Sequence, residues 1–174
     1  YEVSRALASC EGVLLLIDAS QGVEAQTVAN LYAALEHDLT IVPVINKIDL
    51  PSADIERVKE QIDGDLGLDP DGAILCSAKE GIGIDDVLEA IVQRIPPPKG
   101  LEEEPLAAVI FDAHYDPFRG SVIGCRLFSG RVRAGDTILL MSKAARYKVE
   151  EVGQFLLKRQ PKNSLNCGQV GYII

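Results

Sequence analysis

The sequence predicts an α/β domain with a mostly parallel sheet, followed by an all-β barrel. Three observations lead to this fold class. Short apolar runs alternate with helical periodicity up to residue 95, a segment rich in proline and glutamate follows, and short strands separated by Gly, Asp and Pro come after it. Strands that alternate with helices are typical of βαβ units, whereas several short strands in about 70 residues are typical of a closed or partly closed barrel.

Two apolar runs in the first half predict buried strands. Residues 13–17 and 41–45 are short, continuous and rich in branched side chains, as expected for parallel strands that are covered on both faces. Pro43 fits the second strand less well, because proline favours edge strands. Residues 73–75 predict a weaker third strand.

Three stretches predict amphipathic helices that alternate with these strands. In each, apolar residues recur at helical spacing, which puts an apolar stripe on one helix face, ready to pack on a sheet. The stripes are Val28, Leu31, Tyr32 and Leu35; Ile55, Val58 and Ile62; and Ile84, Val87, Leu88, Ile91, Val92 and Ile95.

A proline run and a glutamate run predict the domain boundary. The prolines at 96–98 end the last helix, and Glu102-Glu103-Glu104-Pro105 follows without apolar periodicity. We therefore assign residues 1–95 to the α/β domain, 96–104 to a linker and 105–174 to the barrel. Within the barrel, residues 106–111, 121–128, 137–141 and 148–155 predict strands.

Charge separates the two halves. Residues 1–100 carry 7 Lys and Arg against 18 Asp and Glu, whereas residues 101–174 carry 10 against 8. The acidic half argues against a broad phosphate-binding face there. Any contact with nucleic acid would lie in the second half, where a solvated face is the usual explanation of the basic residues and contact with RNA phosphates is the alternative. Its basic residues are Lys143, Arg146, Lys148, Lys158, Arg159 and Lys162.

The motif Asn46-Lys47-Ile48-Asp49 directly follows the second predicted strand. Ligands of open α/β sheets bind at the carboxyl ends of strands. An aspartate there can accept hydrogen bonds from the ring N–H and the exocyclic amine of guanine. Adenine has an acceptor at that ring nitrogen and would be repelled. Asn46 can bond the base edge or a neighbouring loop, and the stem of Lys47 can lie over the ring. A polar turn is the alternative.

A second motif, Cys76-Ser77-Ala78-Lys79, follows the next predicted strand. Here a backbone N–H of a small residue can meet the guanine carbonyl, and Ser77 can brace the loop. A turn is again the alternative. Two such motifs at successive strand ends favour a base-binding site over chance. The four cysteines form no C-x-x-C pair, so we predict no metal-binding residue.

Together these motifs resemble the guanine-specificity motifs of GTPases. Residues 18–27 (DASQGVEAQT) are similar to a strand-to-helix segment of translational GTPases, and residues 130–136 (GRVRAGD) to a signature of their barrel domain. More narrowly, residues 46–51, 95–100 and 111–120 resemble the LepA family, also called elongation factor 4, more than elongation factor G or BipA.

The resemblance implies part of a P-loop GTPase-like domain joined to a barrel of the domain II type, acting on the ribosome through rRNA and ribosomal proteins and not on DNA. It implies GTP or GDP as ligand and Mg²⁺ in the parent protein. It also implies a cytoplasmic location with peripheral association at the inner face of the membrane. The residues expected around the base are Asn46, Lys47, Asp49, Ser77, Ala78 and Lys79.

The phosphate-binding motif of such enzymes, G-x-x-x-x-G-K-S/T, does not occur in the 174 residues. We therefore expect residues 1–95 to be the C-terminal part of a GTP-binding domain, without its P-loop and switch regions. No catalytic residue is assigned, and the chain alone is not expected to hydrolyse GTP. An alternative is a non-catalytic module that binds the ribosome or another protein.

Overall fold

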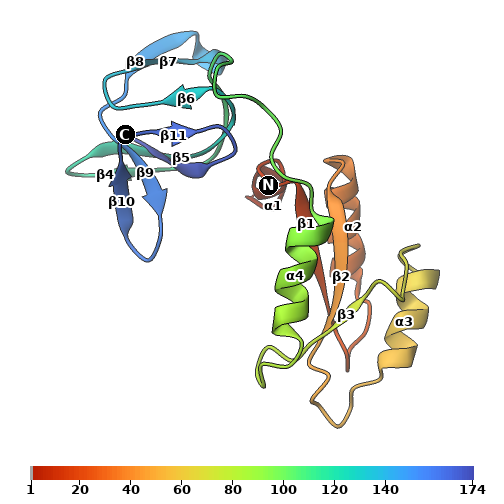
Figure 1. The fold of residues 1–174 in the computed structure, drawn as a ribbon. Helices are drawn as coiled ribbons and strands as arrows, with labels where there is room; N and C mark the ends of the chain where they lie inside the picture. Colours follow the sequence, from red (N-terminus) through yellow and green to blue (C-terminus); the bar gives the residue numbers. More distant parts are fainter. Residues whose placement is uncertain (1) are drawn as a thin grey trace. The chain divides into compact units, whose positions relative to one another are not determined.

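A computed structural model describes residues 2–174 and divides them into two compact units. The first is Cys10–Pro97, which Figure 1 colours from red to green. The second combines Pro98–Ile174 with residues 2–9, which include helix α1 (Glu2–Leu7). None of the helices in the described part of the chain has the length and apolar character needed to cross a membrane.

The first unit is built on a three-stranded parallel sheet in the order β1-β2-β3, as predicted. The strands are β1 (Gly12–Asp18), β2 (Thr40–Asn46) and β3 (Ile74–Leu75). Pro43 lies in the central strand opposite Leu15 of β1. Pairing of β2 with β3 begins only at Val44, so Pro43 precedes the segment of β2 that needs partners on both sides.

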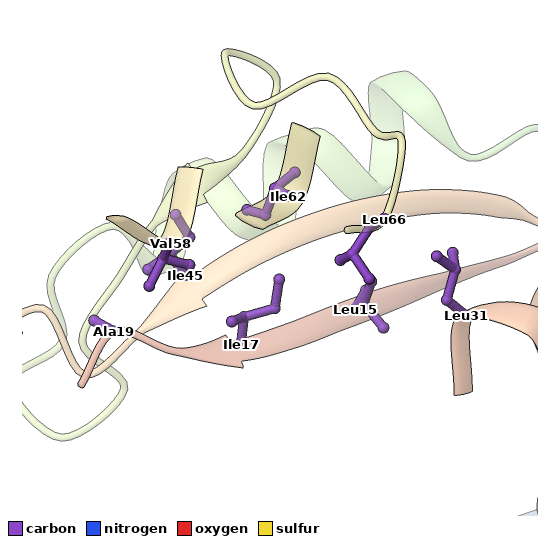
Figure 2. Packing of buried hydrophobic residues seen from close by; sticks show 8 residues of the cluster. All are labelled: Leu15, Ile17, Ala19, Leu31, Ile45, Val58, Ile62 and Leu66. Carbon is purple, nitrogen blue, oxygen red and sulfur yellow. The ribbon is translucent and has the colours of Figure 1, made fainter. Parts of the chain in front are cut away.

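Helices α2 (Ala25–Glu36) and α3 (Ile55–Gly64) cover one face of this sheet, and α4 (Ile84–Arg94) covers the other (Figure 1). The period of two in a strand sends alternate side chains to opposite faces. Figure 2 shows the first face, where strand residues meet Leu31 of α2 and Val58 and Ile62 of α3. The second face buries Val42, Val44, Cys76 and Ala90.

The apolar stripes of the helices are wider than the part of each helix that the sheet buries. Leu31 and Ala34 of α2 are buried, but Tyr32 and Leu35 are exposed. On α4, Ala90 is buried and Val92 is exposed. The apolar stripes of α2 and α4 therefore pack on the three-stranded sheet only in part.

The second unit is an antiparallel β-rich domain, as predicted. Its five-stranded sheet has the order β10-β9-β12-β5-β4, and two further pairs are β11-β6 and β7-β8. Its core consists of Cys125, Leu127, Val132, Val149, Val152, Leu165 and Ile173. The strands are β4 (Ala107–Asp116), β5 (Gly120–Ser129), β6 (Arg131–Val132), β7 (Thr137–Leu140), β8 (Ala145–Lys148), β9 (Val152–Phe155), β10 (Arg159–Lys162), β11 (Leu165–Asn166) and β12 (Val170–Ile173).

One predicted strand, residues 148–155, is wrong, because the chain changes partner within it. Strand β8 ends at Lys148 and β9 begins at Val152. Between them the N–H of Val149 donates to the carbonyl of Asp136 over 2.8 Å, and the N–H of Glu150 donates to that of Ile174 over 2.7 Å. The segment thus passes from the β7–β8 hairpin into the five-stranded sheet.

Candidate functional site

Polar residues gather at the carboxyl ends of the three parallel strands. Asp18 is the last residue of β1 and pairs in register with Asn46, the last residue of β2. Strand β3 ends at Leu75, beside Ile45, so that Ser77 follows next to the end of β2. Ligands of open α/β sheets bind at this edge. We define the strand-end cluster as Asp18, Asn46, Lys47, Asp49, Ser77 and Ala78.

The side chain of Asn46 joins the loops that follow β2 and β3. Its Oδ1 accepts hydrogen bonds from the backbone N–H of Lys47 over 2.8 Å and of Ala78 over 3.1 Å. The thiol of Cys76 donates to the same oxygen over 3.6 Å. The carbonyl end of the amide is therefore turned inward. Its NH₂ group, which makes no hydrogen bond to any described residue, is the end available to a ligand.

Ser77 holds the carboxylate of Asp49. The buried hydroxyl of Ser77 donates to Oδ1 of Asp49 over 2.6 Å and accepts from the N–H of Glu80 over 3.2 Å. The backbone of Ser77 is fixed as well, by hydrogen bonds in both directions with Ile82. The hydrogen bond from Ser77 lowers the pKa of Asp49 from its ordinary value, so the carboxylate is charged at neutral pH. Its second oxygen receives no hydrogen bond from another described residue.

Lys47 is turned toward the end of β1. Its backbone has a φ of 65°, a left-handed conformation that is uncommon for residues other than glycine and often marks a functional segment. Its Nζ lies 2.7 Å from Oδ2 of Asp18. The hydrogen bond from Lys47, followed by that from Ser20, holds the pKa of Asp18 well below its ordinary value, and Asp18 in turn raises the pKa of Lys47.

The structure brings five of the six predicted residues into this cluster. Lys79 differs, because its Nζ pairs with Glu80 over 3.2 Å and 79% of its side chain is exposed. Asp18 was absent from the predicted set. A polar residue at the end of a predicted strand was the signal available, since Asp18 occupies the same place on β1 as Asn46 does on β2.

The cluster offers a ligand an anionic acceptor at Asp49, a neutral donor at Asn46 and the aliphatic stem of Lys47. An acceptor and a donor suit the edge of a heterocyclic base, and an aliphatic stem suits its face. No group of three or more His, Cys, Asp or Glu residues that could hold a metal ion occurs within residues 2–174. The acceptor, the donor and the aliphatic stem of the strand-end cluster together fit a base.

A second polar cluster lies in the barrel, where the turn of the β4–β5 hairpin meets the start of β10, the residue before β9 and strand β12. We define the hairpin cluster as Asp116, Arg119, Glu151, Arg159 and Tyr172. Arg159 Nη2 lies 2.7 Å from Asp116 Oδ2, and Arg119 Nη1 lies 2.9 Å from Glu151 Oε2. The hydroxyl of Tyr172 donates to Glu151 Oε1 over 2.7 Å.

Electrostatics support the pairing within the hairpin cluster. Arg159 lowers the pKa of Asp116, assisted by the backbone N–H of Phe118. Burial, together with the hydrogen bond to Glu151, raises the pKa of Tyr172 to about 12. Arg159 was among the basic residues considered for RNA phosphates, but its guanidinium is already bound to Asp116.

Comparison with known proteins places both halves of the chain. The family model of the elongation factor Tu GTP-binding domain matches residues 1–97, and that of elongation factor Tu domain 2 matches residues 120–174. The whole chain is 71% identical to elongation factor 4 of Syntrophus aciditrophicus and 70% identical to that of Syntrophobacter fumaroxidans. The chain is 64% identical to elongation factor 4 of Aquifex aeolicus in an alignment that covers 99% of the chain. The chain spans 29% of the length of each of these relatives.

Proposed function

Because the chain belongs to the elongation factor 4 family of translational GTPases, we propose that it supplies the base-reading loops and the barrel of a ribosome-dependent GTPase. In this proposal residues 1–95 are the C-terminal part of the GTP-binding domain, residues 96–104 the linker and residues 105–174 domain II. The activity belongs to the full-length protein, by which we mean a polypeptide of the length of the relatives that contains this chain.

The observation that carries the proposal is the pair of hydrogen bonds between the two motif loops. Ser77 donates to Asp49 and Ala78 donates to Asn46, so both loops border one small site. The Asp49 carboxylate accepts from the ring N–H and the exocyclic amine of guanine, a charge-assisted pair that adenine cannot form. Specificity for guanine follows from this difference in hydrogen-bonding edge.

The remaining residues hold the base in place. The NH₂ group of Asn46 donates to the base edge, and the backbone N–H of Ala78 lies beside it to share with the guanine carbonyl. The stem of Lys47 covers the ring face. Lys79 stands at the rim, where its charge attracts the nucleotide. Each of these roles is proposed from the placement of the groups around Asn46 and Asp49.

Phosphates and Mg²⁺ are bound, in this proposal, by residues of the full-length protein outside this chain. Phosphoryl transfer depends mainly on positioning and on electrostatic stabilisation of the phosphates. A chain with base contacts alone is therefore expected to hydrolyse no GTP and to bind nucleotides weakly. We include no membrane in the proposal, since neither the names of the relatives nor any feature of the described residues points to one.

The ribosome is the proposed partner because the relatives are elongation factors. The barrel half carries a small excess of positive charge, whereas residues 1–100 are strongly acidic. Lys143, Lys158 and Lys162 are exposed and form no ion pair with a described residue. Such free cations suit the phosphates of rRNA, and the elongation factor family favours this role over a merely solvated face.

One substitution tests base reading and ribosome dependence together. In the full-length protein, Asp49→Asn replaces an acceptor by a group that can donate to the extra oxygen of xanthine. We expect GTP affinity to fall by about 100-fold, since a charged hydrogen-bond partner is lost, and ribosome-stimulated hydrolysis to transfer from GTP to XTP. Rates with GTP, XTP and ATP, measured with and without ribosomes, give the answer.

The outcomes separate the two parts of the proposal. An Asp49→Asn protein that keeps its preference for GTP contradicts base reading by Asp49. A wild-type protein whose GTP hydrolysis is unchanged by ribosomes contradicts the proposed partner. Glu80→Gln is the matched control, because it removes a neighbouring carboxylate that contacts Lys79 and leaves Asp49 and Asn46 intact.

A further inference from the structure

Both oxygens of Asp18 are engaged, one within its own turn and one with Lys47. Its Oδ1 accepts from the N–H and hydroxyl of Ser20, over 2.8 and 2.7 Å, and from the N–H of Gln21 over 3.3 Å. The turn is itself anchored, since the N–H of Ala19 donates to the carbonyl of Asn46 over 2.8 Å. One oxygen of Asp18 therefore fixes the carboxylate, and Oδ2 faces Lys47.

The ion pair decides where the side chain of Lys47 lies. A lysine has a flexible stem, and an exposed ion pair contributes little to stability. Here the partners are unequal: the side chain of Asp18 is 14% exposed and that of Lys47 is 55% exposed. The fixed carboxylate consequently orients the mobile ammonium group, and the stem of Lys47 extends from the end of β2 to the end of β1.

We propose that Asp18 is a positioning residue for Lys47, fixing its stem as the wall against which the ring of a guanine base packs. The inference rests on the proposed function and extends it to a residue outside the two base-reading motifs. Asp18 touches no base in this account. It orders the lysine before the nucleotide arrives, so that less side-chain freedom is lost on binding.

Two substitutions separate this role from simple bracing of the turn. Asp18→Asn keeps a carbonyl oxygen for Ser20 and Gln21, but its NH₂ group cannot accept from the ammonium of Lys47. Lys47→Met removes the ammonium and keeps an unbranched apolar stem. If Asp18 acts through Lys47, Asp18→Asn has no further effect once Lys47 is Met.

The experiment measures GDP dissociation constants of the full-length protein for wild type, Asp18→Asn, Lys47→Met and the double variant. We expect Asp18→Asn to weaken GDP binding about two- to fivefold in the wild-type background and to change nothing in the Lys47→Met background. The preference for GDP over ADP should persist in Asp18→Asn, whereas Asp49→Asn abolishes it.

A second measurement needs no nucleotide. In the 174-residue chain with ¹³C-labelled lysine, the Lys47 Cε resonance, identified by its loss in Lys47→Met, reports the titration of this ammonium group. Asp18 raises the pKa of Lys47, so the titration should move to lower pH in Asp18→Asn. A structural role confined to the turn would leave it in place.

Several results would overturn the inference. Equal losses of affinity in both backgrounds would show that Asp18 acts independently of Lys47. Wild-type binding by Asp18→Asn, or an unmoved Lys47 titration, would remove the positioning role while leaving guanine recognition by Asp49 intact. A wild-type protein with no preference for GDP over ADP would refute the proposed function itself, and the inference with it.

Discussion

The strand-end cluster and the hairpin cluster use the same chemical groups in different ways. In the hairpin cluster both carboxylates have each oxygen engaged. Asp116 accepts from Arg159 on one oxygen and from the N–H groups of Phe118 and Arg119 on the other, and Glu151 accepts from Tyr172 and Arg119. In the strand-end cluster Asp18 is engaged on both oxygens too, but Ser77 engages only one oxygen of Asp49, and the second has no partner from another described residue.

We therefore describe the hairpin cluster as a clamp, which joins two hairpins, and propose that the strand-end cluster is a receptor, which binds a ligand. Polar groups that leave water are normally paired within the protein. The hairpin cluster achieves this internally and ties the β4–β5 and β9–β10 hairpins together. In the strand-end cluster, one polar atom of Asn46 and one of Asp49 hold these side chains in place through hydrogen bonds. The other polar atom of each side chain has no partner among the other described residues and is available to a ligand. Substitutions in each cluster test this contrast.

The first prediction concerns how rigidly the strand-end cluster is held. Gly83 has a φ of 69°, and a Cβ there would lie 2.2 Å from the carbonyl oxygen of Leu75, two residues before Ser77. Gly83→Ala should therefore lower the free energy of unfolding by about 3 kcal/mol, through left-handed strain and overpacking. Urea unfolding of the 174-residue chain, followed by circular dichroism, measures this loss.

Gly81 provides the matched control. It has a similar φ of 74°, but a Cβ there would meet nothing within 4 Å. Gly81→Ala should cost about 1 kcal/mol, from backbone strain alone. If both variants lost the same free energy of unfolding, the loop after β3 would be able to move away from the added methyl group. The strand-end cluster would then be held loosely and not rigidly.

The second prediction tests whether the hairpin cluster is closed through Tyr172. Tyr172→Phe removes the hydroxyl that donates to Glu151, and the free energy of unfolding should fall by about 1.5 kcal/mol near pH 8. Tyr115→Phe is the control, since Tyr115 is 74% exposed and its loss should change little. A Tyr172→Phe chain as stable as wild type would contradict the clamp.

Alkaline pH should remove the same contribution. The pKa of Tyr172 is raised to about 12, above the value of about 10 for an unfolded tyrosine. Because the folded state retains this proton longer, the contribution is complete below about pH 10 and is lost as pH rises toward about 12. The stability margin of wild type over Tyr172→Phe should therefore shrink across that interval.

Local patterns predicted what local sequence determines. The apolar runs at 13–17 and 41–45 became β1 and β2, because a buried parallel strand has to be apolar on both faces. The single strand predicted at 148–155 failed, because alternation of residues does not reveal a change of pairing partner at Val149. An apolar stripe on a helix likewise does not reveal how much of it the sheet will cover. Val92 of α4 belongs to such a stripe and is exposed.

The candidate site shows the same limit. Asn46 and Asp49 lie three residues apart, so their joint chemistry could be inferred from one short motif. Asp18 is far from Lys47 in the sequence, and their contact arises only because β1 and β2 pair in register at Asp18 and Asn46. The long-range partners in the hairpin cluster, such as Asp116 and Arg159, were unpredictable for the same reason.

The smallest change in GDP affinity is expected at Lys79, at the rim of the strand-end cluster, and a larger one at Ser77 in its interior. The ammonium of Lys79 pairs with Glu80 in solvent, so Lys79→Ala should weaken GDP binding by the full-length protein less than about twofold. The buried hydroxyl of Ser77 holds Asp49, and Ser77→Ala should weaken binding about tenfold. Titration with GDP compares the two variants. Equal losses would mean that Lys79 leaves Glu80 to contact the nucleotide, and the receptor would then include the rim.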